Sequence, residues 1–594
     1  MGRLLFAVAA SAAFSAPLAA APARAAEPRA AVTGEMDPDL RAAIVRAVGD
    51  IDRPVDNRFE ARRRANSAAE DAIAVLRSEG YYAYEVTPEL GEGDIPKASI
   101  HVTPGPRFHL VRPRIEWVGA APDPVTQLAA QAALALGPGS PGVAADVVSA
   151  EGRAVAAVQD GGYADAAAAP REVVVDHADD TVAPTYRLNA GPLVRLDGIR
   201  LTTNGRTGAP WLQGLAPWRS GETYRADDVA TLERRLLDTG VYDSVTVSLA
   251  PADQATAAGL RPVIVNLSER KRRTIETGAS YGSNEGVGAD IRWTHYNVLG
   301  RADTVAVFAK ESKLDSRVGG DLTLPHWRMP DQTLSLEAAA YKTTTDAYDA
   351  TGIGVKADAL RHYTKTSYLT LGASIDYAKS DEIKPGTLTS LGRDILTLGT
   401  LADLALDRSD DPLNPTHGWR VSARAEPTLL VGQGTVPYLK VQAGASIYFP
   451  FGQQASTVLA ARLHAGSILN GTVSAIPAPQ RFYAGGGGSV RGFAYQGVGP
   501  RLPDNTPQGG LSVVEGSIEV RHELTRDWGV VAFVDAGAVG ATQFPAFKDA
   551  GVGAGVGVRY NLGFGPIRVD VAVPLTDARG GSAFQLYVSI GQAF

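Results

Sequence analysis

The sequence predicts three small α+β units followed by an all-β transmembrane barrel of about 16 antiparallel strands. The N-terminal half repeats a pattern of helix, glycine, aromatic residue and strand at a spacing of roughly 80 residues. After Lys271 helical periodicity nearly vanishes, and the segments alternate apolar and polar residues. Beyond the first residues, no segment is continuously apolar for the roughly 18 residues of a spanning helix, so this chain can cross a membrane only as a closed barrel.

Composition argues against several classes of protein. The 594 residues include 57 basic and 64 acidic side chains, and the net charge of -7 is spread along the chain, unlike that of a nucleic-acid-binding protein. Cysteine is absent, which excludes thiol chemistry, thiolate metal sites and disulfides. The nine histidines form no metal-ligand spacing, and the glycines at 485–488 lack the lysine of a phosphate loop. We therefore expect no enzymatic activity, no metal and no cofactor.

The first residues have the features of a secretory signal. Arg3 supplies the positive start, an alanine-rich apolar stretch follows, and Ala23-Arg24-Ala25 is a cleavage site of the A-x-A type. A membrane anchor is the alternative, but the apolar stretch contains two serines and a proline. The sequence predicts a signal peptide over residues 1–25 and export of the remaining chain.

The N-terminal half is predicted to contain three repeated units. In the third unit leucines recur at helical spacing, and Gly240 follows where a left-handed C-cap is expected. A strand of alternating valines comes next. A set of unrelated small α+β domains remains the alternative. The pattern occurs at 72–86, 154–166 and 232–249, and predicts units over 26–105, 106–188 and 189–271.

Residues 272–594 are predicted to form the barrel. In 565–575 valines alternate with Arg568 and Asp570, and in 512–523 apolar residues alternate with Glu515 and Glu519. A soluble sandwich would alternate in the same way. The length of the segments, and the alternation of short connections such as 296–304 with long ones such as 379–394, favour the membrane barrel. An even number of strands leaves both barrel ends on the periplasmic side.

Closure of the barrel requires the first strand, about 274–283, to pair with the last, about 583–594. The last segment places Phe584, Leu586, Val588, Ile590 and Phe594 on one outward face. Glycines weaken both strands, so this seam can open sideways and offer an edge for β-augmentation. The alternative is that these glycines only relieve crowding or curvature. The predicted seam residues are Ile275, Thr277, Gly278, Gly282, Gly591 and Phe594.

Three distinctive stretches in the predicted barrel are "DPLNPTHGWRVSA" (411–423), "RFYAGGGGSVRGF" (481–493) and "VVAFVDAGAVG" (530–540). These stretches resemble the BamA/TamA/FhaC superfamily of outer-membrane insertases and secretion pores. The repeated units resemble POTRA domains, and three of them, rather than five or two, indicate the TamA type. The resemblance covers essentially the whole chain after the signal.

The resemblance implies a function in the bacterial outer membrane, with the POTRA domains in the periplasm. A protein of the TamA type helps to insert autotransporters and other outer-membrane proteins from their unfolded state, by lateral opening of the seam. It would also support phospholipid transport to outer-membrane lipids together with a TamB-like partner. The alternatives are an export pore of the two-partner secretion type and a plain diffusion porin.

The resemblance also implies a role for the motif Val490-Arg491-Gly492-Phe493. In this family the long loop that carries the motif folds back into the lumen, and its arginine meets acids on the inner wall. The implied partners of Arg491 are Glu519, which lies on the polar face of its segment, and Asp535, although Phe533 would share the face of Asp535. A guanidinium suits this role because its planar fork holds two carboxylates. From the residues alone, a solvated loop charge remains the alternative.

Overall fold

The computed structural model describes residues 27–51, 55–92, 96–282, 286–385, 387–432, 434–452, 456–562, 565–578 and 581–594. The predicted signal peptide over residues 1–25 lies outside this range. The chain divides into two compact units, described separately below. The first contains the described residues up to Asp197 with Ser220–Asp227 and Ala255–Arg261, and the second contains Gly198–Arg219, Asp228–Gln254 and Pro262–Phe594.

The first α+β segment packs two helices on a three-stranded sheet, with alanines of the longer helix forming much of the core. Side chains of Asp37 and Asn57 accept hydrogen bonds from backbone N–H groups at the two helix starts, which satisfies donors that lack an intrahelical partner. The elements are β1 (Glu27–Pro28), β2 (Ala31–Thr33), α1 (Pro38–Val48), β3 (Asp50–Ile51), α2 (Arg58–Ser78), β4 (Glu85–Leu90) and β5 (Ala98–Thr103), and the sheet order is β2-β5-β4.

The second α+β segment repeats this plan. Two helices cover a sheet in which the central strand pairs in parallel with two short strands and antiparallel with a long one. The elements are β6 (His109–Leu110), β7 (Arg114–Trp117), α3 (Pro124–Ala133), α4 (Ala144–Asp160), β8 (Ala167–Asp176) and the central β9 (Thr181–Asn189).

The third α+β segment has a three-stranded sheet in the order β10-β12-β11. Gly240 ends its main helix with a φ of +68°, the left-handed conformation that the sequence pattern predicts. The elements are β10 (Leu196–Leu201), α5 (Ala209–Gln213), α6 (Ala226–Asp238), β11 (Tyr242–Leu249), the 3₁₀ turn η1 (Ala252–Gln254) and β12 (Arg261–Glu269). None of the helices in the described part of the chain has the length and apolarity needed to cross a bilayer.

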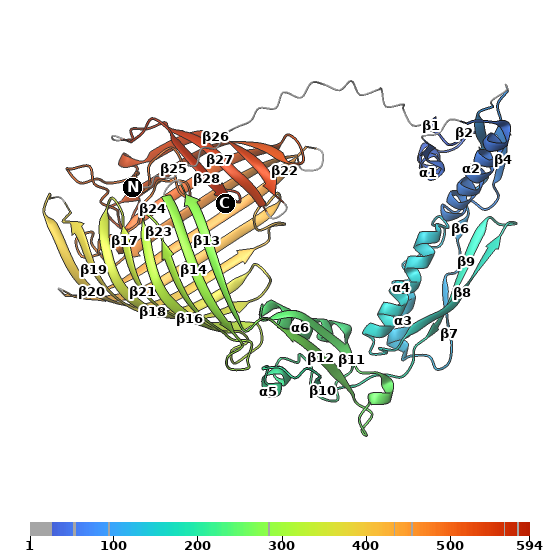
Figure 1. Ribbon diagram of the computed structural model, residues 1–594, viewed down its shortest axis with the longest axis horizontal. Helices are drawn as coiled ribbons and strands as arrows, with labels where there is room; N and C mark the ends of the chain where they lie inside the picture. The colour runs from blue at the N-terminus through green and yellow to red at the C-terminus, as the bar shows by residue number, and fades with distance from the viewer. Residues whose placement is uncertain are drawn as a thin grey trace, which may run out of the picture. The chain divides into compact units, whose positions relative to one another are not determined.

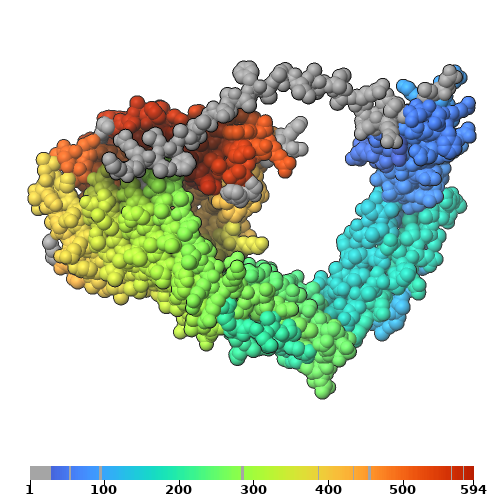
Figure 2. Space-filling model, in the orientation of Figure 1, coloured from blue at the N-terminus to red at the C-terminus, as the bar shows by residue number. Residues whose placement is uncertain are grey.

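The remaining strands form a single 16-stranded antiparallel sheet in sequence order, which confirms the predicted fold class. The strands tilt and lie side by side in Figure 1, and Figure 2 shows the green and yellow strands as a continuous outer wall. They are β13 (Arg273–Gly282), β14 (Gly286–Tyr296), β15 (Thr304–Glu311), β16 (Asp315–Leu324), β17 (Gln332–Thr344), β18 (Tyr348–His362), β19 (Tyr368–Ile383), β20 (Ser390–Asp407), β21 (Gly418–Val431), β22 (Thr435–Phe451), β23 (Thr457–Leu469), β24 (Ser512–Glu523), β25 (Trp528–Gly540), β26 (Gly551–Leu562), β27 (Gly565–Pro574) and β28 (Gln585–Ile590). Two 3₁₀ turns, η3 (Ala478–Gln480) and η4 (Phe547–Asp549), lie in the connections.

The side chains of the barrel wall alternate as the sequence predicts. On β27 Val571 is 43% exposed on the outer face, whereas its neighbour Asp570 is fully buried on the inner face. An apolar outer face and a charged inner face match a wall that contacts lipid on one side and a polar lumen on the other.

Two sequence-based expectations about strand ends are wrong. The connection over 379–394, which was predicted to be long, is short. β19 continues to Ile383 and β20 already begins at Ser390. β20 has 18 residues, more than the roughly ten that cross a bilayer, so these strands extend beyond the membrane. The last strand is shorter than predicted and ends at Ile590, since Gly591 adopts a φ of +86°.

Candidate functional site

The long connection between β23 and β24, residues 470–511 and here called the luminal loop, fills part of the barrel interior. Val490 and Phe493 are buried in an apolar cluster with residues of β23, β24 and β25. A Cβ atom on Gly492 would come within 2.7 Å of the Val573 carbonyl oxygen, and one on Gly553 within 1.9 Å of the Arg491 carbonyl oxygen. Glycine is therefore required on both sides of this contact, because the loop backbone touches the wall directly.

The structure places Arg491 against three carboxylates. Its Nε and one Nη hydrogen-bond the two oxygens of Asp535 at 2.6 and 2.8 Å, and its other Nη lies 2.6 Å from Glu519. That second Nη also donates to Asp570 at 3.1 Å. All three acids are fully buried, and Arg491 is 1% exposed. The guanidinium also lies 3.4 Å from the ring centroid of Phe533. Phe533 and Asp535 lie on the same face of β25, so Arg491 stacks on the ring of one and forms an ion pair with the other.

Three further arginines complete this group, here called the arginine cluster. Arg521 donates to Glu519 at 2.9 Å, Arg559 donates to Asp570, and Arg568 lies 3.6 Å from Asp570. Each buried carboxylate therefore has a cationic partner, which buried charges require. The sequence placed Asp570 on the polar face of its segment but gave no sign that it reaches Arg491.

A second anchor holds the start of the luminal loop and was missed by the sequence analysis. Arg481 donates to both oxygens of Glu382 at 3.1 and 3.2 Å, and Arg393 lies 2.8 Å from the same carboxylate. Glu382 was assigned to a loop, although it lies on β19 with its side chain buried. Arg481 belongs to the stretch that carries the family resemblance, which was the available signal.

A third anchor holds the glycine run. The Ser489 hydroxyl donates to Glu515, and His464 Nδ1 lies 3.0 Å from the other oxygen of that carboxylate. Arg462 donates to the Gly488 carbonyl oxygen at 3.1 Å. The luminal loop is thus fixed to β19, β23, β24, β25 and β27. The glycine run at 485–488 lies between the anchors at Arg481 and Arg491.

The seam between β13 and β28 differs from every other strand junction of the described barrel. The two strands approach each other, but within the described ranges no ladder pairing joins them. β28 pairs with β27 over six residues, whereas β13 pairs with β14 over ten. The first and last strands therefore meet without a continuous hydrogen-bonded ladder, and the pairing expected from the sequence is not seen among the described residues.

The predicted seam residues occupy different faces. Ile275 is 68% exposed on the outer face, and Thr277 lies on that face too. A Cβ atom on Gly278 would come within 2.4 Å of the exposed Asp290 carboxylate, so a larger residue here would displace that side chain. Gly282 pairs with Gly286 at the end of the first hairpin.

Phe594 does not continue the outward row, contrary to the prediction. After Gly591 the chain turns into the lumen, where Phe594 packs on Tyr448 and Val458. The Arg521 guanidinium lies 5.2 Å from its ring centroid. The positive φ of Gly591 interrupts the period-two alternation on which the prediction rested.

The third α+β segment contacts the turn between β14 and β15 through a buried polar network. The Asn297 amide donates to the Thr207 hydroxyl at 3.0 Å and to Glu269 at 3.2 Å. Burial disfavours ionisation of Glu269, but hydrogen bonds from Arg206 and Thr207 outweigh it and hold the pKa of this carboxyl below its usual value. The segment is therefore attached to the barrel by an ionised carboxylate.

The turn between β16 and β17 makes a similar contact. Arg235 of α6 forms an ion pair with Asp331 at 3.0 Å. His326 Nδ1 accepts a hydrogen bond from the Asp331 backbone N–H, and its Nε2 lies 2.9 Å from the Arg235 carbonyl oxygen. Burial lowers the pKa of His326, and the neutral ring satisfies both neighbours.

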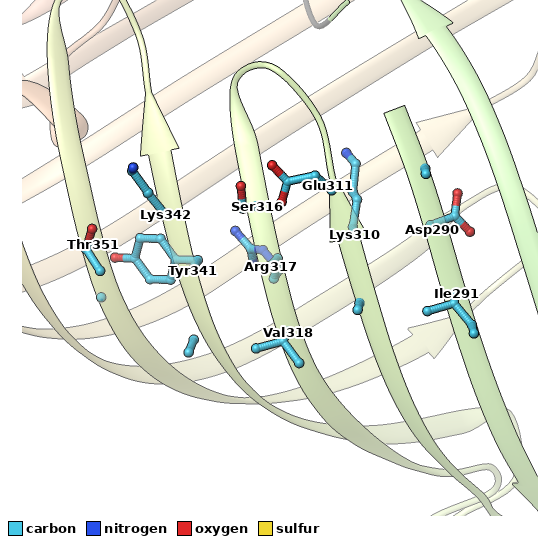
Figure 3. Close-up of a pocket in the computed structure, with 14 residues that line it drawn as sticks. Asp290, Ile291, Lys310, Glu311, Ser316, Arg317, Val318, Tyr341, Lys342 and Thr351 are labelled. Carbon is cyan, nitrogen blue, oxygen red and sulfur yellow. The ribbon is translucent and has the colours of Figure 1, made fainter. Parts of the chain in front are cut away.

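A shallow hollow of about 580 Å³ lies on the wall of β14–β18, shown in Figure 3. Arg317 and Tyr341 line it, but Arg317 stacks on the Tyr341 ring and Tyr341 donates to Asp376 at 2.9 Å. These groups stabilise the inner wall rather than converge on a ligand. Within the described residues, no cluster of three histidine or acidic side chains can hold a metal ion.

A family model described as the Omp85 superfamily domain matches residues 297–594, half of the chain. The chain belongs to the Omp85 superfamily. This Omp85 protein is 24% identical over 423 residues to the outer membrane protein assembly factor BamA of Neorickettsia risticii, covering 68% of this chain and 55% of the relative. It is 22% identical over 395 residues to BamA of Neisseria meningitidis, covering 60% of this chain and 48% of the relative. The chain thus spans about half the length of the curated relatives it matches.

The fold of this Omp85 protein is similar to that of BamA from Haemophilus ducreyi lacking POTRA domains 1–3. The TM-score is 0.67 at 19% sequence identity, and the match covers 82% of this chain and all of the solved chain. At this identity the likeness concerns the fold.

Proposed function

We propose that this Omp85 protein is an outer-membrane insertase that passes unfolded outer-membrane proteins into the bilayer through the β13–β28 seam. The observation that carries the proposal is the seam itself, where two neighbouring strands of the described barrel lack a connecting ladder. A backbone N–H or C=O without a partner in hydrocarbon costs several kcal/mol. An incoming strand that pairs with the edge of β13 supplies those partners, so the seam favours β-augmentation.

The luminal loop supports an insertase over a diffusion porin. Its motif is held inside the lumen by fully buried ion pairs, and its apolar residues fill a core there. A plain porin requires an open aqueous path along its axis. With the lumen occupied, the lateral seam is the favoured route for a polypeptide.

The finer assignment to the TamA type rests on the number of α+β segments. Three such segments, each with a small sheet and helices, precede the barrel. On this basis the substrates are autotransporters and other outer-membrane proteins, the partner is a TamB-like periplasmic protein, and the pair also supports phospholipid transport. The α+β segments lie in the periplasm, where their sheet edges receive unfolded chains. Co-purification of a TamB-like protein with the full chain tests the partner, and its failure to bind would contradict the TamA assignment.

A locked seam tests the proposed function. The chain contains no cysteine, so Ile275→Cys with Ile590→Cys can be joined specifically by a bifunctional thiol reagent. The matched control joins Ala340→Cys to Ile353→Cys, which are direct partners on β17 and β18. We expect the seam lock to block insertion of an outer-membrane protein into liposomes and the control to leave it unchanged.

Two other outcomes contradict the proposal. Full insertion by the locked protein would exclude the lateral route. Loss of insertion together with continued export of a soluble chain through the locked protein would favour a two-partner-secretion-type pore instead.

A further inference from the structure

The last strand is bonded to the luminal loop by one side chain. Tyr587 of β28 points into the barrel and is 2% exposed. Its hydroxyl donates to the Phe493 carbonyl oxygen at 2.8 Å and accepts from the Gly492 backbone N–H at 3.1 Å. Both groups belong to the motif that carries Arg491, so the hydroxyl joins a seam strand to the loop that the arginine cluster fixes.

The ring of Tyr587 is enclosed as tightly as its hydroxyl. It packs in a buried cluster with Val531, Phe533 and Ala572. A Cβ atom on Gly487 would come within 2.9 Å of the ring, so the glycine run lies directly on it. Phe533 also stacks on Arg491, and the same small core therefore supports both the loop and the last strand.

Two series of polar contacts connect the arginine cluster to the residues after β28. In the first series, Arg559 binds Asp570, and its Nε donates to the Gln592 side chain at 2.9 Å. In the second series, Arg521 binds Glu519 and also donates to a backbone oxygen of Phe594 at 3.0 Å. The segment that follows the last strand is thus tied to the cluster at two points.

These ties matter because the ladder that holds β28 is short. It has six paired residues on one side and, among the described residues, no ladder to β13 on the other. On an ordinary barrel strand, side-chain hydrogen bonds add little to two long ladders. On β28 the lumen-facing bonds are a large share of what fixes the strand.

We infer that Tyr587 is a positioning residue that couples the luminal loop to the seam, so that β28 moves away from β13 only when its hydroxyl releases the backbone of Gly492 and Phe493. This inference rests on the proposed lateral opening and adds a mechanism that regulates the opening. A substrate that displaces the luminal loop also releases β28 from the loop. Conversely, a loop held by Arg491 keeps the seam shut. The coupling is reciprocal, because one set of bonds links the two elements.

The experiment measures seam opening directly in the full chain. Spin labels attached at Ile275→Cys and Ile590→Cys report the distance between β13 and β28 in nanodiscs, measured by pulsed electron paramagnetic resonance. Tyr587→Phe removes the hydroxyl and keeps the ring. The matched control is Tyr560→Phe on β26, whose ring lies on the outer wall against Trp528. We expect Tyr587→Phe to raise the long-distance population about tenfold, from the loss of two sheltered hydrogen bonds, and the control to leave it unchanged.

A second readout separates coupling from a purely structural role. Arg491→Lys should raise the same long-distance population, and the double variant with Tyr587→Phe should add less than the sum of the two effects on a free-energy scale. Wild-type distances in Tyr587→Phe would overturn the inference, as would strict additivity.

The inference and the proposed function fail in different ways. If a locked seam blocks insertion but Tyr587→Phe leaves the distances unchanged, the coupling is wrong and the insertase stands. If Tyr587→Phe opens the seam but a locked seam still inserts substrate, the coupling stands and the lateral route is wrong.

Discussion

The two sides of the barrel are built from the same alternating sequence but are held together differently. β19 and β20 pair over 16 residues, whereas β27 and β28 pair over six, and no ladder joins β28 to β13 among the described residues. On the β19–β20 side the wall is stabilised by its ladders. On the seam side the wall depends on side chains that reach across the lumen to the loop. Lumen substitutions should therefore affect the seam side far more than the opposite wall.

The largest effect is expected from Arg491→Ala. It leaves Glu519, Asp535 and Asp570 without their shared cation, and loss of one partner of a buried ion pair costs about 3–5 kcal/mol. We expect insertion to fall at least tenfold and the luminal loop to become accessible to added protease. Arg491→Lys should be intermediate, since an ammonium cannot reproduce the planar fork.

The matched control for this prediction lies on the opposite wall. Arg424 of β21 also faces the lumen and pairs with Glu426 at 2.9 Å, but its side chain is 42% exposed. Arg424→Ala should therefore change insertion by less than twofold. Normal insertion by Arg491→Ala would contradict the claim that the seam side of the barrel depends on the arginine cluster.

A methyl group on the inner wall should have the next largest effect. In Gly553→Ala the new Cβ would meet the Arg491 carbonyl oxygen at 1.9 Å, so the luminal loop must move. Overpacking of this kind costs about 1–3 kcal/mol. Gly516→Ala on β24 is the control, because the nearest atom to its Cβ lies at 3.8 Å. Melting temperatures of both variants in detergent test this contrast, and equal values would contradict a close fit of loop and wall.

Glu382→Gln should weaken the second loop anchor. The neutral amide of glutamine cannot balance the positive charges of Arg481 and Arg393. A hydrogen bond to a charged group contributes about 1.5–3 kcal/mol to stability. We expect faster proteolysis within residues 470–485 while the arginine cluster stays intact. The control is Glu337→Gln on β17, whose carboxylate pairs at 3.0 Å with Lys356 of the neighbouring strand instead of with a residue of the luminal loop, and it should leave proteolysis unchanged.

The smallest effect is a pH dependence of stability at the turn between β16 and β17. The folded protein holds the pKa of His326 below its ordinary value of 6.5, so the unfolded chain binds the proton more readily. The stabilising contribution of the neutral ring is complete above about pH 6.5 and declines as the pH falls through the folded pKa. Amides of residues 325–331 should therefore have lower protection factors, which are corrected for the intrinsic pH dependence of exchange, at pH 5 than at pH 8. His326→Gln should reduce this difference, and an undiminished difference would assign it to other groups.

The sequence was informative where a local period determines the structure. Alternation along 512–523 was sufficient to place Glu519 on the inner face, and the valines of 565–575 were correctly placed outward. Gly240 was recognised because a helix end with a left-handed residue has a local signature.

The sequence was uninformative where distant strands meet. Alternation gives the face of Asp570 and Tyr587 but not their height in the barrel, so neither contact with the luminal loop could be derived. Glu382 was assigned to a loop because nothing in a local pattern shows that β19 extends beyond the membrane. Phe594 was placed outward because the alternation does not register the turn at Gly591.

Backbone hydrogen exchange across the seam tests the central claim most directly. In nanodiscs, the β13 amides that face β28 should exchange much faster than amides of β19 and β20, since the latter lie in ladders of 16 pairs. Uniformly slow exchange in β13, equal to that of β19, would demonstrate a continuous ladder between first and last strands and would contradict this account.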